Sequence, residues 1–156
     1  MAKEIILISA CLLGQKCRYD GKSKPVKDIL KLEEFYDLIP ICPESLGGLK
    51  IPRAPAEIKG DRVINKNNKD VTENYNTGAY WASAVARMKN VKLAVLKERS
   101  PSCGVHFIHD GSFTDKVIPG QGITARKLLK QGVKVINEEE ALELYKRLKE
   151  GKDENL

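Results

Sequence analysis

Three of the four cysteines in the chain stand just after short apolar runs, where buried strands are expected to end. They are Cys11 after residues 5–8, Cys42 after residues 38–41, and Cys103 after residues 91–96. The carboxyl ends of parallel strands share one edge of a sheet, and ligands collect at that edge. Thiolate is a soft ligand that both iron–sulfur clusters and zinc accept. We therefore predict that the three strand ends meet and that their thiols hold one metal centre.

Polar side chains beside these cysteines are suited to hydrolysis. Glu44 lies two residues beyond the second cysteine and fits the role of a general base or a general acid. A carboxylate at this place is equally suited to pairing with Arg18 or Arg53 at the rim of a site. The hydroxyls of Ser100 and Ser102, just before the third cysteine, can hydrogen-bond a substrate or a cluster sulfide, or they can satisfy the backbone of the turn.

The role of Cys17 separates two kinds of metal centre. This cysteine lies six residues after Cys11, in a segment rich in turn residues. A cubane cluster held by three cysteines keeps one iron open as a Lewis acid for a soft substrate atom. With Cys17 as a fourth ligand, an iron–sulfur or zinc centre would instead serve storage, delivery, sensing or electron transfer. A third reading is a nucleotide-binding α/β module whose cysteines are only core residues, and the residues alone leave all three open.

Length and composition describe an ordinary soluble protein of one domain. The chain has 156 residues, of which 42% are hydrophobic and 31% charged, and no run approaches the ~20 apolar residues of a membrane span. The first residues enter a strand-like run directly, without the pattern of a signal peptide, so we expect a cytoplasmic protein with reduced thiols. The net charge of +6 suits a nucleotide-like partner or a solvated basic surface, and no nucleic-acid-binding module is recognisable. Nothing indicates the oligomeric state.

Strand-like and helix-like segments alternate along the chain. The apolar runs predict strands at 4–9, 38–42, 91–97 and 133–136. The periodic segments predict helices at 28–37, at 70–89, from a start within 120–124 to about residue 130, and after residue 137. Capping boxes are predicted at Asp70 with Glu73 and at Asn137 with Glu140.

Two further segments complete the prediction. Residues 43–69 are expected to form a long irregular rim or lid with a brief strand pairing at 63–65, and Asp110-Gly111 predicts a hairpin between 105–109 and 112–114. Alternating strands and helices favour a parallel sheet with helices on both faces. The predicted fold class is therefore α/β: one three-layer Rossmann-like domain over residues 1–151, with about four mostly parallel strands, a small β-hairpin, and a charged tail at 152–156.

Taken together, the motifs resemble those of the thiouracil desulfidase family. They occur in order over essentially the whole chain, and the three cysteine motifs in combination are specific. The segments concerned are Cys11-Leu12-Leu13-Gly14, Arg18-Tyr19-Asp20-Gly21, Cys42-Pro43-Glu44, Gly47-Gly48-Leu49, Pro52-Arg53, Asp70-Val71-Thr72, Ser100-Pro101-Ser102-Cys103-Gly104 and Asp110-Gly111.

The resemblance implies an enzyme with a 4Fe–4S cluster bound by three cysteines only, which by motif are Cys11, Cys42 and Cys103. It implies hydrolysis of the thiocarbonyl group of a small thiolated pyrimidine, such as 2-thiouracil or 4-thiouracil, to the oxo form. Hydrosulfide is released without net redox change, and thiouridines, including nucleosides derived from tRNA, are alternative substrates. By the same resemblance Glu44 handles proton transfers, and either Ser100 or Ser102 positions or polarises the substrate.

Overall fold

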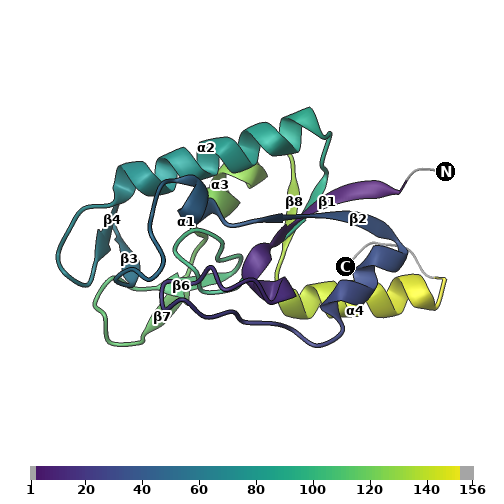
Figure 1. The fold of residues 1–156 in the computed structure, drawn as a ribbon, viewed down its shortest axis with the longest axis horizontal. Coiled ribbons are helices and arrows are strands. Elements are labelled where there is room, and N and C mark those ends of the chain that lie inside the picture. Colours follow the sequence, from purple (N-terminus) through teal and green to yellow (C-terminus); the bar gives the residue numbers. More distant parts are fainter. Residues whose placement is uncertain (1–2, 152–156) are drawn as a thin grey trace.

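A four-stranded parallel sheet forms the centre of the protein in the computed structural model, which describes residues 3–151 (Figure 1). Its strands are β1 (Glu4–Ser9), β2 (Tyr36–Ile41), β5 (Leu93–Val95) and β8 (Lys134–Ile136). The spatial order is β2-β1-β5-β8, and every neighbouring pair is parallel. The predicted α/β fold with four parallel strands is confirmed. The predicted tail at 152–156 lies outside the described residues.

Alternate side chains of β1 divide the core into two layers. Leu7 is fully buried against α2 (Thr72–Met88) and α3 (Ile123–Lys130) on one face of the sheet. Ile6 and Ile8 are fully buried against η2 (Ile29–Glu34) and α4 (Glu138–Lys149) on the other face. Burial of each such side chain contributes about 1.5–3 kcal/mol. An apolar run that is covered on both faces therefore becomes the strand around which three layers assemble.

The helix predicted at 28–37 is shorter and tighter than expected. Residues Ile29–Glu34 form the 3₁₀ helix η2, and the chain already enters β2 at Tyr36. Ile29 and Leu32 are both buried, and a spacing of three residues aligns side chains on one face of a 3₁₀ helix. The apolar spacing does indicate a helix, but its period of three residues is that of a 3₁₀ helix rather than an α-helix.

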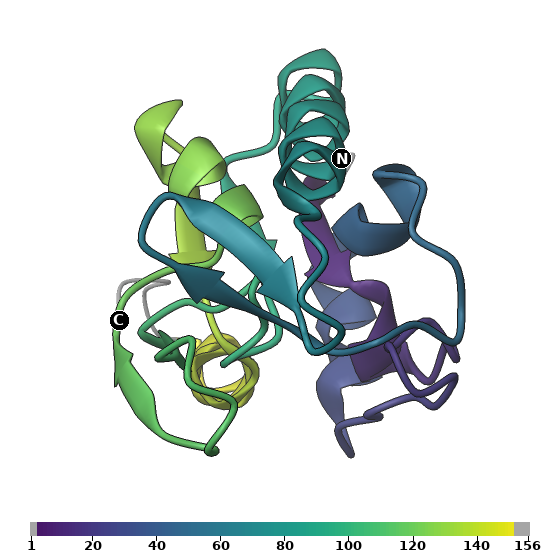
Figure 2. The same ribbon diagram turned by 90° about the vertical axis from the view of Figure 1, so that its left-hand side faces the viewer.

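The segment predicted to be irregular contains three short elements. They are α1 (Pro43–Leu46), β3 (Ala56–Lys59) and β4 (Arg62–Asn65), of which β3 and β4 pair as an antiparallel hairpin. The predicted pairing at 63–65 is confirmed. Viewed from the carboxyl edge of the sheet, this hairpin lies in front, with α2 above it (Figure 2). It forms one wall over the strand ends.

One of the two predicted capping boxes is formed. The Asn137 side chain accepts the Glu140 amide, and the Glu140 carboxylate accepts the Asn137 amide, at the start of α4. The box predicted at Asp70 is wrong, because α2 begins one residue later and has no side-chain cap. Asp70 instead accepts the Thr72 amide and pairs with Arg62 at 2.9 Å.

The second hairpin uses a later strand than predicted. Strand β6 (Phe107–His109) pairs with β7 (Val117–Pro119), and residues 110–116 form the connection. The predicted partner at 112–114 is wrong, because the Asp110 carboxylate accepts both the amide and the hydroxyl of Ser112. These bonds curl the chain into a loop before a second strand begins.

Two glycines bring α1 against α2. A Cβ atom on Gly78 would lie 1.9 Å from the Pro43 carbonyl oxygen, and one on Gly47 would lie 1.9 Å from the Asn74 carbonyl oxygen. Only glycine allows the two helix backbones to approach so closely. This contact fixes the start of α1, which carries the residues just after β2.

No helix of the described part of the chain is long and apolar enough to cross a membrane.

Candidate active site

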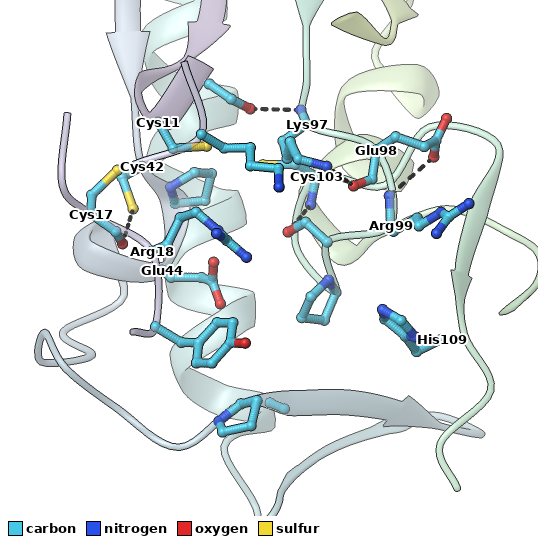
Figure 3. A pocket seen from close by; sticks show the side chains of 18 of the residues that line it. Cys11, Cys17, Arg18, Cys42, Glu44, Lys97, Glu98, Arg99, Cys103 and His109 are labelled. Carbon is cyan, nitrogen blue, oxygen red and sulfur yellow. Dashed lines mark hydrogen bonds between the residues drawn. The ribbon is translucent and has the colours of Figure 1, made fainter. Parts of the chain in front are cut away.

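Three cysteines lie at the carboxyl edge of three adjacent strands. Cys11 lies in the 3₁₀ turn η1 (Ala10–Leu13), which follows β1 directly. Cys42 comes immediately after β2 and precedes α1. Cys103 lies on the turn that follows β5. Because β2, β1 and β5 are neighbours and run in the same direction, their ends bring the three thiols to the same edge, as Figure 3 shows.

A pocket of about 860 Å³ opens at this edge. Its volume lies in the range of small-molecule sites, roughly 300–1,000 Å³. Of the four cysteines and the three candidate catalytic residues named from the sequence, only Ser102 is absent from the lining. These lining residues are Cys11, Cys17, Cys42, Glu44, Ser100 and Cys103. The three strand-end cysteines, which were predicted to meet, therefore line one pocket.

The thiols of Cys17, Cys42 and Cys103 resist ionisation where they stand. Burial raises the pKa of Cys103 to about 12. A hydrogen bond with Cys17 and burial raise the pKa of Cys42 well above its ordinary range, and a hydrogen bond with Cys11 raises the pKa of Cys17. A bound cationic metal centre reverses this preference, because coordination displaces the thiol proton. Thiols that line one pocket, two of them buried and two half-buried, thus fit a metal cofactor chemically.

The described residues contain no preformed ligand set for a single metal ion. Within residues 3–151, no three side chains of His, Cys, Asp or Glu are gathered for one metal ion. A tetrahedral zinc site places its sulfurs only about 3.8 Å apart, given Zn–S bonds of ~2.3 Å. An iron–sulfur cubane has its own width and takes thiolates spread around it. The zinc alternative therefore finds no preformed ligand set in the described chain.

Glu44 is held from both of its oxygens. Its Oε1 lies 3.3 Å from Arg53 Nη2, and its Oε2 accepts the hydroxyl of Tyr75. Of the two pairings considered from the sequence, the one with Arg53 is formed, while Arg18 lies 3.6 Å from Asp20. The carboxylate lies in the first turn of α1, so the glycine-mediated contact of α1 with α2 also sets its position.

Tyr75 contacts the candidate base Glu44, and no motif of the sequence points to it. Its side chain belongs to the buried face of α2, and the residue is 2% exposed. Burial raises its pKa above the ordinary range, and the Glu44 carboxylate raises it further, so the hydroxyl stays protonated and donates. Arg53 also donates to the Cys17 carbonyl oxygen at 3.0 Å. The ion pair thereby joins Glu44 to the loop of the fourth cysteine.

The two serines before Cys103 have different surroundings. Ser100 Oγ accepts the amides of Ser102 and Cys103 at 3.1 and 3.0 Å, so its own proton is left for a partner in the pocket. Ser102 is 1% exposed, and its Oγ lies 2.9 Å from Thr124 Oγ1. Ser102 is thus turned towards Thr124 at the start of α3 and, unlike Ser100, is not among the residues that line the pocket.

Glu98 stabilises the turn after Cys103 through hydrogen bonds, a role that no sequence motif predicts. Its Oε1 accepts the amides of residues 105–107 at 2.8, 2.9 and 3.0 Å, and its Oε2 accepts the Asn137 side chain. Burial opposes ionisation of Glu98, but the Asn137 and backbone hydrogen bonds outweigh it and lower the pKa. A carboxylate that gathers three consecutive amides holds the Cys103 turn against β6.

Three comparisons place this geometry among known proteins. Residues 6–140 match the sequence model of the family described as 2-thiouracil desulfurase. The uncharacterized protein YbbK of Bacillus subtilis (strain 168) is 41% identical over 146 residues, which covers 87% of this chain and 97% of that protein. The solved structure of the 4Fe–4S-dependent thiouracil desulfidase TudS is 40% identical, covers 94% of this chain and 99% of its own, and superposes with a TM-score of 0.85.

Proposed function

Because the chain belongs to the 2-thiouracil desulfurase family, we propose that it hydrolyses the thiocarbonyl group of a thiolated pyrimidine. Water and the thiocarbonyl compound are consumed, and the oxo compound and hydrosulfide are formed, with no net change of oxidation state. The substrate class comprises 2-thiouracil and 4-thiouracil, with thiouridines and tRNA-derived nucleosides as further members. The proposed location is the cytoplasm, where thiols stay reduced, and the proposed working unit is the single α/β domain.

One observation carries this proposal. Thiols from three adjacent strand ends line the same pocket as a fixed carboxylate and a serine with a free proton. Hydrolysis of a carbon–sulfur double bond requires a thiophilic centre, a base for water and a donor for the substrate. The pocket contains a candidate for each of these requirements.

The proposed cofactor is a 4Fe–4S cluster held by Cys11, Cys42 and Cys103. When bound, the cluster supplies a thiophilic Lewis acid for the thiocarbonyl sulfur. Cys17 stays outside the proposed ligand set. Its segment follows no strand of the sheet, and the family motifs supply only the three strand-end cysteines, although the Cys17 thiol hydrogen-bonds with those of Cys11 and Cys42. The name of the TudS structure supports the cluster type.

The chain's own residues supply proton transfer and orientation. Glu44 takes up the proton of the attacking water and returns it to the departing sulfur. Arg53 and Tyr75 hold its carboxylate in one orientation at the pocket wall. Ser100 donates its free proton to the substrate, since its oxygen already accepts two amides. Ser102, with its hydroxyl on Thr124, positions the turn.

The test is anaerobic reconstitution followed by measurement of hydrosulfide release from 2-thiouracil, 4-thiouracil and thiouridines. For Glu44→Gln we expect iron and sulfide contents equal to wild type and a loss of turnover of about 100-fold or more, the usual contribution of a general base. Glu143→Gln, on the exposed face of α4, is the matched control and should behave as wild type.

Each part of the proposal has its own contradicting result. A fully reconstituted protein that releases hydrosulfide from none of these compounds would overturn the activity. An intact cluster in Cys103→Ala would overturn the ligand assignment. Wild-type turnover in Glu44→Gln would remove its acid–base role. Loss of the cluster in Cys17→Ala, with an inactive wild type, would favour the non-catalytic four-cysteine centre instead.

A further inference from the structure

A buried carboxylate outside the cysteine motifs holds one wall of the pocket. Glu57 lies on β3, is 8% exposed and lines the pocket. Its Oε1 accepts the amide of Gly111 at 2.9 Å and the amide of Phe113 at 3.1 Å. A buried carboxylate is costly unless it is hydrogen-bonded. Glu57 therefore fastens the loop of residues 110–116 to the β3–β4 hairpin.

The loop is packed tightly against that hairpin. A Cβ atom on Gly111 would lie 2.8 Å from the Ile58 carbonyl oxygen, and the φ angle of Gly111 is +92°. Glycine is thus required here both for space and for backbone conformation. Together with the two amide bonds to Glu57, this contact fixes the path of the loop.

Phe113 has a backbone conformation that an aromatic residue rarely adopts. Its φ angle is +58°, and a left-handed conformation is strained in a bulky residue and persists only where the surroundings impose it. The half-buried ring lines the pocket, and the Lys59 ammonium lies 5.8 Å from its centroid. The strain is therefore maintained by Glu57 and Gly111, and it places a flat apolar ring in the pocket.

The loop that carries this ring starts on the side of the pocket away from three of the cysteines. In Figure 3, His109 lies on the far side of the pocket from Cys11, Cys17 and Cys42. The loop that carries Phe113 begins directly after His109, at the end of β6. A substrate whose sulfur points towards the cysteines would extend its ring towards this wall.

We propose that Phe113 is the stacking platform for the pyrimidine ring and that Glu57 is the residue that positions it. The inference rests on the proposed function, because it assigns the ring-binding wall of the same pocket. Stacking of a base on an aromatic side chain is independent of the base's hydrogen-bonding pattern. The wall would thus accept pyrimidines in general, and the thiophilic side of the pocket would select those with sulfur.

The experiment measures binding without turnover. The dissociation constant of the reaction product uracil is determined by calorimetry on reconstituted protein, beside kcat and KM for 2-thiouracil and the iron content. For Phe113→Ala we expect uracil binding to weaken about 5- to 100-fold, the range of base–aromatic stacking. Phe113→Tyr should bind as wild type, because it keeps the ring. Trp81→Leu, an exposed aromatic of α2 away from the pocket, is the control.

A second pair of variants tests the positioning role. Glu57→Ala should weaken uracil binding as Phe113→Ala does, and Glu57→Gln, which keeps an acceptor oxygen, should do so less. If Glu57 acts through Phe113, the double variant Glu57→Ala/Phe113→Ala should bind no worse than Phe113→Ala alone. A merely structural role for Glu57 would lower the melting temperature but give additive losses of binding.

The failure of this inference is distinct from failure of the proposed function. Active wild-type enzyme with unchanged uracil binding in Phe113→Ala would overturn the platform and leave the activity standing. A loss of binding in Phe107→Ala but not in Phe113→Ala would move the platform to β6 and also overturn it. An inactive wild-type protein that binds no uracil would overturn both the function and the inference.

Discussion

Replacement of Tyr75 by Phe tests how the candidate base is held. The substitution removes one hydroxyl group from a residue that is 2% exposed, and it leaves the ring in the core. Glu44 loses the hydrogen bond at Oε2 but keeps its ion pair with Arg53 at 3.3 Å. The measured change therefore reports the tyrosine–carboxylate contact rather than the loss of packing.

The expected magnitude follows from the charge and exposure of the partner. A hydrogen bond to a charged group contributes about 1.5–3 kcal/mol. The Glu44 side chain is 18% exposed, so water can replace the lost donor in part, and the lower end of this range applies. A loss of about 1.5 kcal/mol lowers the melting temperature of a domain of this size by roughly 3–6 °C.

Thermal unfolding of Tyr75→Phe, Glu44→Gln and the double variant measures the coupling directly. We expect a coupling free energy of about 1 kcal/mol or more, since residues in direct contact are non-additive. Turnover of Tyr75→Phe should fall less than about tenfold, because the carboxylate remains in place, whereas loss of a general base costs ~100-fold or more. Additive stabilities, or an unchanged melting temperature in Tyr75→Phe, would refute the reasoning.

Three further substitutions test the ligand set and the scaffold. Cys17→Ala should bind as much iron and sulfide as wild type, and loss of either on elemental analysis would make Cys17 a ligand. Ser102→Ala should lower the unfolding free energy by about 1–3 kcal/mol, because the Thr124 hydroxyl loses its buried partner, with kcat within about threefold. A large loss of kcat at full stability would return Ser102 to the active site. Gly78→Ala should cost about 3 kcal/mol or more in denaturant unfolding, since its Cβ would meet the Pro43 carbonyl oxygen at 1.9 Å. Wild-type stability would contradict the close contact of α1 with α2.

The sheet was predictable because burial on both faces leaves a simple pattern. A strand such as β1 is apolar at nearly every position, and a run of that short length followed by turn residues favours a doubly covered strand over a helix. The position of Cys11 at its end followed from connectivity alone. The same reasoning failed where side chains redirect the backbone, as Asp110 does when its carboxylate accepts Ser112 and delays the second strand of the hairpin.

The candidate site was predictable in its thiols and only partly in its support. Sequence reasoning finds a residue when its type is unusual for its place, as a cysteine at a strand end is. It does not find Tyr75, whose position on an apolar helix face conceals a hydroxyl aimed at Glu44. Nor does it separate Ser100 from Ser102, because the difference lies in Thr124, which packs on one of them from a helix 22 residues further along the chain.

These two kinds of residue depend on different parts of the fold. The thiols are placed by strand order, which is set by burial of the whole core and tolerates many sequences. Glu44 is positioned by three contacts, each of which depends on one particular residue. Gly78 allows α1 to approach α2, Tyr75 donates a hydrogen bond to the carboxylate, and Arg53 forms the ion pair with it. Metal binding should therefore survive more substitutions than hydrolysis does. A variant that keeps its iron but loses hydrosulfide release is the expected outcome for changes along α1 and α2. Loss of the iron, and of hydrosulfide release with it, is expected only at the three strand-end cysteines.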